Sequence, residues 1–502
     1  MPDDDRPAMS MRQPRLAGWH IAGNIGAWAL PLLATIVAMP FLWRLLGRDG
    51  YGLYVLAAGY AALAGSLGPL RGAAQRVASR ASSAAGVRAA SGGAYLAAIG
   101  TGAVALVAAL VAAPAFLRVA GLDPDTSPSM LLAVRLAAAA APAMHVTAAG
   151  RGVLIGLERY GRYGAHVAVT SGVTTLGTVL LAARGGQAPE LMAWLAAASL
   201  LSAAGAVALA QTAGVGLPVF SRSDGRAIVR FGATVVATDA IGSLYVLAER
   251  TILTRAMGVG IVAEYTIPLS VASALQHALG AGAVVLLPRA GAAWARADSV
   301  ALRSMYVRAV KVMVLVAVGG SIAIAGAAET LVGWWIDPGF ARQTAAVVVV
   351  LLAAFAVNAA ATPLWCLSEG AARPARNTAL SAGIALVGAG AAVALAPGFG
   401  PLGVAWARGL AMVAVPVFIA SGERRLLGGG QRELWRAIAR HVVPAALVLG
   451  AAVALARHLL SGVPLIGAAG LLLAVFAGWL WRSSYFDAAD RNAIGRLVRA
   501  RV

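Results

Sequence analysis

The chain has 502 residues, of which 60% are hydrophobic and only 12% are charged, and its mean hydropathy is +0.80. These values lie outside the range of water-soluble globular domains and predict an integral membrane protein. The formal net charge of +20 would indicate nucleic-acid binding in a soluble protein, but here the basic residues stand in short breaks between apolar runs.

Apolar stretches long enough to cross a membrane recur along the whole chain. About 20 helical residues span roughly 30 Å of hydrocarbon. The fold class is therefore predicted to be an all-α integral membrane protein with about fourteen transmembrane helices. We expect these helices at residues 17–43, 51–70, 94–117, 130–150, 165–183, 191–212, 229–249, 262–287, 310–331, 344–367, 378–396, 401–420, 441–456 and 463–481.

The basic residues alternate between the two sides of the membrane that this count defines. Thirty of them fall on the side of the two termini and eight on the opposite side, while Arg135 and Arg408 fall within spans. By the positive-inside rule, both termini are predicted to lie in the cytoplasm. The polar, acidic N-terminal segment and the long first apolar run predict an uncleaved first span and no signal peptide.

Two pairs of motifs indicate that the chain contains an internal repeat. Gly47–Tyr54, "GRDGYGLY", and Gly258–Tyr265, "GVGIVAEY", lie 211 residues apart, and "GLERYGRYGA" from Gly156 matches "GAARPARNTA" from Gly370 at an offset of 214. We therefore expect a cytoplasmic N-terminal tail (1–16), a first six-helix bundle (17–220), a second six-helix bundle (221–420), helices 13 and 14 (421–482) and a cytoplasmic C-terminal tail (483–502). The alternative is chance recurrence in a chain rich in Ala, Gly and Arg.

The stretches around these motifs resemble the polysaccharide flippases of the multidrug/oligosaccharidyl-lipid/polysaccharide (MOP) superfamily, which includes O-antigen repeat-unit flippases and, more distantly, lipid II flippases. "LLGRDGYGLYVLAAGYAAL" is similar to the family's pattern before the second span. "AERTILTRAMGVGIVAEYTIPLS" and "APGFGPLGVAWARGLA" are similar to its patterns between spans seven and eight and at the entry to span twelve. Glu249 stands where many relatives have Asp, which keeps the charge.

This resemblance implies two pseudo-symmetric six-helix bundles around a central cavity, in the bacterial cytoplasmic (inner) membrane. It implies a transporter and not an enzyme, with no cofactor, that moves a polyprenyl-pyrophosphate-linked oligosaccharide for lipopolysaccharide or surface polysaccharide biosynthesis. Its partners would be that lipid-linked glycan, membrane lipids and other polysaccharide-assembly membrane proteins, and no nucleic acid. Cavity arginines meet the pyrophosphate in this family, and Arg250 lies in the matched motif.

Ionisable residues within or next to the spans are the candidates for function, because charge is costly inside a membrane. Arg250 is the first candidate for the pyrophosphate, since a guanidinium donates bidentately and stays charged at any depth. Asp239 lies near the middle of the seventh span and three helical turns from Arg250, and with Glu249 it is a candidate for ion coupling. A structural polar contact between packed helices is the alternative for Asp239 and for Arg250.

Three more arginines and one amide complete the candidate substrate-binding set. Arg44, Arg48 and Arg255 lie in the outer turns of the two repeats, where they can reach lipid phosphates or a cavity mouth, and Asn24 lies on a polar face of the first span. Arg135 and Arg408 are expected to be anchors that reach the headgroups. Single polar residues within spans are expected to form interhelical hydrogen bonds, among them His145, Gln276, His277 and Asn358.

Two other functions are compatible with parts of this pattern. A cation-coupled multidrug exporter of the same superfamily would have a more acidic and aromatic cavity. A glycan polymerase or ligase would need a larger outward loop than "RVAGLDPDTSPS". The sequence has no nucleotide-binding loop or hydrolase motif, and its single cysteine, Cys366, excludes an internal disulfide and a multi-cysteine metal site.

Overall fold

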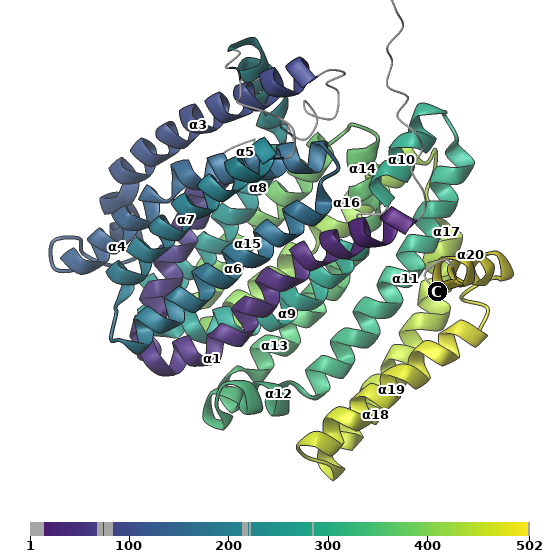
Figure 1. Ribbon diagram of the computed structural model, residues 1–502. Coiled ribbons are helices and arrows are strands. Elements are labelled where there is room, and N and C mark those ends of the chain that lie inside the picture. Colours follow the sequence, from purple (N-terminus) through teal and green to yellow (C-terminus); the bar gives the residue numbers. More distant parts are fainter. Residues whose placement is uncertain are drawn as a thin grey trace, which may run out of the picture.

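A computed structural model of the chain describes residues 15–67, 74, 84–212, 219, 222–283 and 286–499, and every regular element in these ranges is helical. Figure 1 shows long helices packed side by side in one bundle, with the last helices at one edge. This confirms the predicted all-α fold. Residues 1–14 of the expected N-terminal tail (1–16) and residues 500–502 lie outside the described residues.

The first half of the chain supplies the helices up to residue 212. They are α1 (Arg15–Ser66), α3 (Ala84–Val119), α4 (Pro128–Ala139), α5 (Ala141–Gly156), α6 (Tyr160–Ala183) and α7 (Ala188–Ala210). Within this set α1 packs on α6, and α5 packs on both α3 and α7.

The second half has a matching series of helices. They are α8 (Arg222–Met257), the 3-10 turn η2 (Val259–Ile261), α9 (Val262–Ala283), α10 (Leu286–Ala295), α11 (Ser299–Gly326), α12 (Ala328–Trp335), α13 (Pro338–Ala359), α14 (Thr362–Gly370), α15 (Ala375–Ala411) and α16 (Ala414–Leu426). Here α8 packs on α15, and α13 packs on α9 and α11.

The chain then ends in α17 (Arg432–Ala437), the π turn η3 (Ile438–Val442), α18 (Val443–Leu459), α19 (Val463–Arg482) and α20 (Ala488–Arg499). The helices α18 and α19 form a pair against α11 at the edge of the molecule, drawn in yellow-green and yellow in Figure 1. The buried carboxylate of Glu423 in α16 connects α11 to α17. It accepts hydrogen bonds from the Tyr306 hydroxyl of α11 at 2.8 Å and from the Trp435 indole of α17 at 2.9 Å.

Within the described residues, each of the fourteen expected spans lies largely in helical segments. Eleven helical stretches in the described residues are long and apolar enough to cross a membrane. One of them, within α1, is broken at Gly47, and another, from Ala375 to Leu426, is broken at Gly400, so each covers two expected spans. The seventh expected span lies in α8. Large apolar side chains such as Val111 and Leu386, each 76% exposed, face outward, as expected for surfaces that contact acyl chains.

Backbone geometry repeats in the two halves at the spacing that the motifs predict. Gly47 has φ 68° and ψ −178°, and Gly258, 211 residues later, has φ 87° and ψ 166°. Positive φ is accessible to glycine at little cost, which explains the residue at both turns.

The second motif pair repeats as well. Glu158 and Ala372, 214 residues apart, are non-glycine residues with φ of 57° and 56°. The backbone N–H of Arg159 donates to the Leu154 carbonyl, and that of Arg373 donates to the Ser368 carbonyl, each at 2.8 Å. The backbone geometry thus repeats at both motif pairs, and the division into bundles at residues 17–220 and 221–420 stays a prediction.

The largest hydrophobic core runs across the contact between the halves. It includes Leu56 and Tyr60 of α1 together with Leu253 of α8 and Tyr265 of α9, and many of its members are alanines. Small side chains let helix backbones approach closely, and dispersion contacts then stabilise the bundle in a medium where the hydrophobic effect is weak.

Candidate functional site

Arg250 lies on α8 at the contact between the two halves. Its Nη1 donates a hydrogen bond to the backbone carbonyl of Val55 in α1, at 3.2 Å. A Cβ atom on Gly59 would lie 2.8 Å from the same Nη1, so this glycine leaves room for the guanidinium. The Arg250 Nε is buried and has no hydrogen-bond partner among the described residues.

The surroundings of Arg250 are mainly aromatic, and the one carboxylate near it, Glu249, is paired with another arginine. Tyr51 and Tyr54 of α1 are near enough to act on its charge, as are Tyr265 and the adjacent Glu249. Among the described residues no ion pair includes Arg250. A half-buried cation with an unused buried donor has capacity for an anionic ligand.

Glu249, the residue before Arg250 in α8, forms an ion pair with a different arginine, Arg408 of α15. Its carboxylate is fully buried, and it accepts from the Arg408 Nε at 3.1 Å and from the Arg408 Nη2 at 2.5 Å. The Arg408 Nε also donates to the Tyr265 hydroxyl, at 3.2 Å. The Arg408 guanidinium lies over the Tyr245 ring, 4.7 Å from its centroid.

The expectation that Arg408 anchors the protein at the headgroups is therefore wrong, since Arg408 is 7% exposed and lies inside the second half. The signal that could have found this pair is charge balance, because a carboxylate one residue before Arg250 requires its own partner in the membrane. Arg135, in contrast, is exposed, as expected for an anchor.

The two repeat turns pack directly against one another at the end of the bundle that contains Gly47. A Cβ at Gly52 would collide with the Val259 carbonyl, and a Cβ at Gly260 would collide with the Asp49 carboxylate. The exposed Arg48 forms an ion pair across the halves with Glu264 of α9. Glu264 was not among the predicted residues, although it stands inside the repeat motif "GVGIVAEY".

Arg44 and Arg255 occupy equivalent positions and make equivalent contacts. Arg44 Nη2 donates to the Ile336 carbonyl of the second half at 3.2 Å, and Arg255 Nη1 donates to the Arg118 carbonyl of the first half at 3.4 Å. Both side chains are exposed. Together with the Arg48 and Glu264 pair, they hold this end of the two halves together in the conformation described.

Asp239 lies nearer the start of α8 than Arg250, away from the Gly47 end of the bundle. Its side chain is exposed, and it is near enough to the carboxylate of Glu369 in α14 for the two to repel each other. Next to it the hydroxyls of Thr238 and Thr378 are 2.7 Å apart. Asp239 and Arg250 thus lie on one helix but in different surroundings. The Asn24 side chain lies outside the described residues.

Several of the single polar residues form the expected interhelical hydrogen bonds. The Gln276 amide donates to the Thr362 hydroxyl at 3.3 Å, joining α9 to α14. The His145 Nε2 lies 3.1 Å from the Ala64 carbonyl, which joins α5 to α1. These residues stabilise helix packing and do not converge on Arg250.

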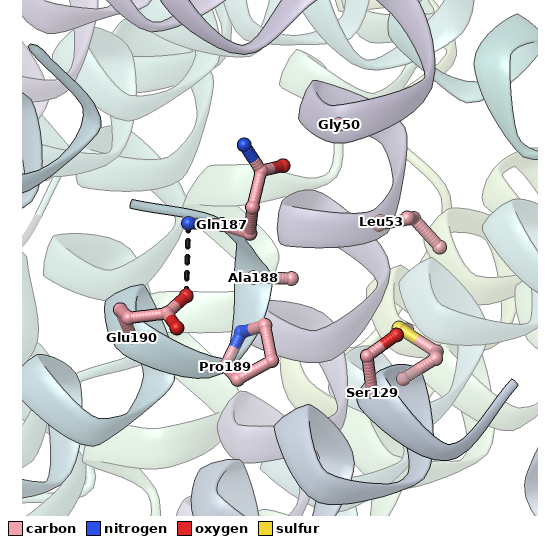
Figure 2. Close-up of a pocket in the computed structure, with 8 residues that line it drawn as sticks. Gly50, Leu53, Ser129, Gln187, Ala188, Pro189 and Glu190 are labelled. Atoms are coloured by element: carbon pink, nitrogen blue, oxygen red, sulfur yellow. Dashed lines mark hydrogen bonds between the residues drawn. The ribbon is translucent and has the colours of Figure 1, made fainter. Parts of the chain in front are cut away.

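A cavity of about 290 Å³ lies beside the first repeat turn. Figure 2 shows the side chains that line it, among them the polar Ser129, Gln187 and Glu190. The Glu190 carboxylate accepts from the Gln187 backbone N–H at 2.9 Å, which caps α7. None of the predicted site residues lines this cavity. In the part of the chain that the structure describes, no three His, Cys, Asp or Glu side chains gather as metal ligands.

The helix order and the paired turns define the class of fold, an all-α bundle of membrane-length helices with repeated turns. Residues 19–294 match the family described as "Polysaccharide biosynthesis protein". Because this match covers more than half of the chain, the protein belongs to the polysaccharide biosynthesis protein family. No match was found among curated protein sequences.

Solved structures with similar folds come from the MOP superfamily. An inward-facing multidrug resistance MATE transporter shares 16% identity, over 82% of this chain and 99% of that one, with a TM-score of 0.67. The lipid II flippase MurJ in an inward closed conformation shares 9% identity over 92% and 98%, also with a TM-score of 0.67. A MOP transporter from Pyrococcus furiosus shares 17% identity over 82% and 98%, with a TM-score of 0.50. At these identities the likeness shows the fold.

Proposed function

We propose that this protein is a flippase that moves a polyprenyl-pyrophosphate-linked oligosaccharide across the bacterial cytoplasmic membrane by alternating access. The observation that carries this proposal is Arg250, a guanidinium between the halves that no carboxylate neutralises. A pyrophosphate would supply the missing negative charge and the hydrogen-bond acceptors. Membership of the polysaccharide biosynthesis family supports a glycan as the cargo.

The contacts between the halves at the Gly47 end of the bundle, here called the closed end, support the proposed alternating access. The Arg48 and Glu264 pair, and the Arg44 and Arg255 hydrogen bonds, are polar contacts of exposed arginines that connect the halves at the Gly47 end, next to the packed repeat turns. Such contacts contribute little stability in water and can be exchanged for solvent. Separation of the halves at this end would release Arg250 from Val55 and expose it to the outer side.

The same proposal assigns the topology and the energy source. With both termini in the cytoplasm, the Gly47 end faces outward, which agrees with the arginine asymmetry of the loops. Asp239 is proposed to take up the coupling proton or cation, because an exposed carboxylate that is repelled by Glu369 gains stability when a cation binds. No step of this cycle requires a cofactor or a covalent change in the substrate.

A multidrug exporter is the second candidate, because several of the similar folds are MATE transporters. The environment of Arg250 disfavours it, since a half-buried guanidinium that forms no ion pair among the described residues repels a lipophilic cation. The choice of substrate in a transport assay separates the two functions.

The proposal predicts that Arg250→Ala abolishes surface glycan display in cells while the protein stays in the membrane. Arg250→Lys should restore part of the activity, because it returns the charge without the planar fork of donors. The exposed Arg135→Ala is the matched control and should display glycan at the normal level. Normal display with Arg250→Ala, at equal protein abundance, would remove Arg250 from the substrate path.

A further inference from the structure

A second group of arginines lies at the opposite end of the second half, around the turn between α14 and α15. Arg376 Nη2 donates to the Ser421 hydroxyl of α16 at 2.9 Å, and its guanidinium carbon lies 5.8 Å from the centroid of the Phe418 ring. The Arg376 Nε is buried and has no hydrogen-bond partner among the described residues. One edge of this guanidinium is therefore held in place while a donor remains unused.

Two more arginines surround Arg376. Arg373 and Arg425 are both exposed and are near enough to repel its charge. The Arg373 guanidinium carbon lies 5.2 Å from the centroid of the Trp294 ring, which holds that side chain over α10. Within the described ranges, no ion pair includes any of these three arginines.

The carboxylates closest in sequence to these arginines have other partners. Glu369 accepts from the Trp365 indole at 2.8 Å and from the Asn377 amide at 3.4 Å. Glu423 accepts from Tyr306, Trp435 and the Gln431 backbone N–H. The positive-inside rule accounts for basic residues at this end. The rule does not explain why three arginines gather around the buried Arg376 Nε, with no ion pair among the described residues.

We infer that Arg373, Arg376 and Arg425 bind a phosphate group at this end of the second half, separately from Arg250. Three guanidiniums supply more N–H donors and positive charge than the protein itself satisfies, and phosphate oxygens match their geometry. The ligand is a phosphate on a membrane-inserted lipid, because α15 and α16 are both parts of an apolar stretch long enough to span the membrane. That phosphate belongs to an anionic lipid headgroup or to a prenyl pyrophosphate.

The first half provides a natural comparison through the internal repeat. Arg162 is the counterpart of Arg376, and its Nη1 donates to the Thr212 hydroxyl at 3.4 Å. Thr212 donates to the Leu209 carbonyl three residues before it, as Ser421 donates to the Phe418 carbonyl. The first half thus repeats the arginine and the hydroxyl. At the spacing of these hydroxyls, however, the position of Arg425 falls on Gly216 and that of Phe418 on Leu209.

Binding to the purified full-length protein tests this inference. The probes are geranylgeranyl pyrophosphate, geranylgeraniol, phosphatidylglycerol and phosphatidylcholine, measured by native mass spectrometry or by thermophoresis in detergent at low ionic strength. The variants are Arg373→Gln/Arg425→Gln, which changes two exposed residues, and Arg376→Gln. The control is Arg162→Gln, which removes the same charge at the equivalent position of the first half.

We expect the double variant and Arg376→Gln each to weaken phosphate-dependent binding roughly tenfold, the effect of losing charge-assisted hydrogen bonds. Arg162→Gln should bind like the native protein. A loss confined to geranylgeranyl pyrophosphate identifies a prenyl pyrophosphate as the ligand, and an equal loss for phosphatidylglycerol identifies the lipid headgroup.

Unchanged binding in the double variant would overturn the inference, and so would an equal loss in Arg162→Gln. Native-like thermal stability of the double variant shows that the site, and not the fold, has changed. Because the measurement is of binding, it stands whether or not Arg250 acts in translocation.

Discussion

Arg250 of α8 and Arg408 of α15, which lie on different sides of α8, have opposite kinds of surroundings. Inside the second half, Arg408 is paired with Glu249, bonded to Tyr265 and covered by Tyr245. Between the halves, Arg250 has one backbone acceptor and a buried Nε without a partner. Since burial is costly for both cations, the difference separates an arginine that stabilises the fold from one that is available to a ligand.

The largest effect expected from breaking this contrast is on stability. Glu249→Gln leaves Arg408 buried without a counter-ion, so it should lower the stability of the folded protein by about 3–5 kcal/mol. Thermal unfolding in detergent measures this loss. The double variant Glu249→Gln/Arg408→Met, which removes both charges, should recover most of it. A double variant that is as unstable as Glu249→Gln would contradict this expectation, because the lost stability would then not come from the unpaired charge of Arg408.

An intermediate effect is expected at Asp239, which tests whether ion coupling is separate from the Glu249 pair. Asp239→Asn removes the charge that a coupling cation would neutralise, so transport should fall about five- to tenfold and lose its dependence on pH, in the range of typical coupling free energies. Uptake into vesicles at several pH values measures this, with the exposed loop variant Asp123→Asn as control. A pH profile that stays the same would assign Asp239 to packing.

The smallest effect is expected at the closed Gly47 end. Glu264→Gln breaks the exposed ion pair with Arg48, which contributes about 0.2–1 kcal/mol, so the open population should rise at most roughly fivefold. Labelling of a cysteine introduced at Val259 with an impermeant maleimide, in a Cys366→Ala background, reports this opening. Glu329→Gln is the control, because its ion pair with Arg457 joins α12 to α18 and not the two halves. Equal labelling in both variants would contradict a gate at Arg48.

The parts of the structure that sequence could predict are those governed by local patterns. Hydropathy predicts all the spans, because a membrane helix must be apolar over a fixed length. The repeat motifs predict the paired turns at Gly47 and Gly258, since positive φ favours glycine. The cytoplasmic location of the two tails stays a prediction, and the side chain of Asn24 lies outside the described residues.

Contacts between distant segments could not be predicted in the same way. Glu249 and Arg408 are 159 residues apart, and the local sequence around each residue does not indicate the other as its partner. Arg48 was predicted for the substrate path without its partner Glu264, and the environment of Asp239 includes Glu369 from a helix far along the chain. Pairing of charges in a membrane depends on helix packing, which a single sequence does not reveal.

Leaflet translocation by the protein reconstituted into vesicles tests the central claim most directly. A polyprenyl-pyrophosphate oligosaccharide and a lipophilic cation are supplied side by side to the native protein and to Arg250→Ala. The account predicts that the native protein moves the glycan lipid and not the cation, and that Arg250→Ala moves neither. Transport of the cation alone, or glycan translocation by Arg250→Ala at the native rate, would contradict it.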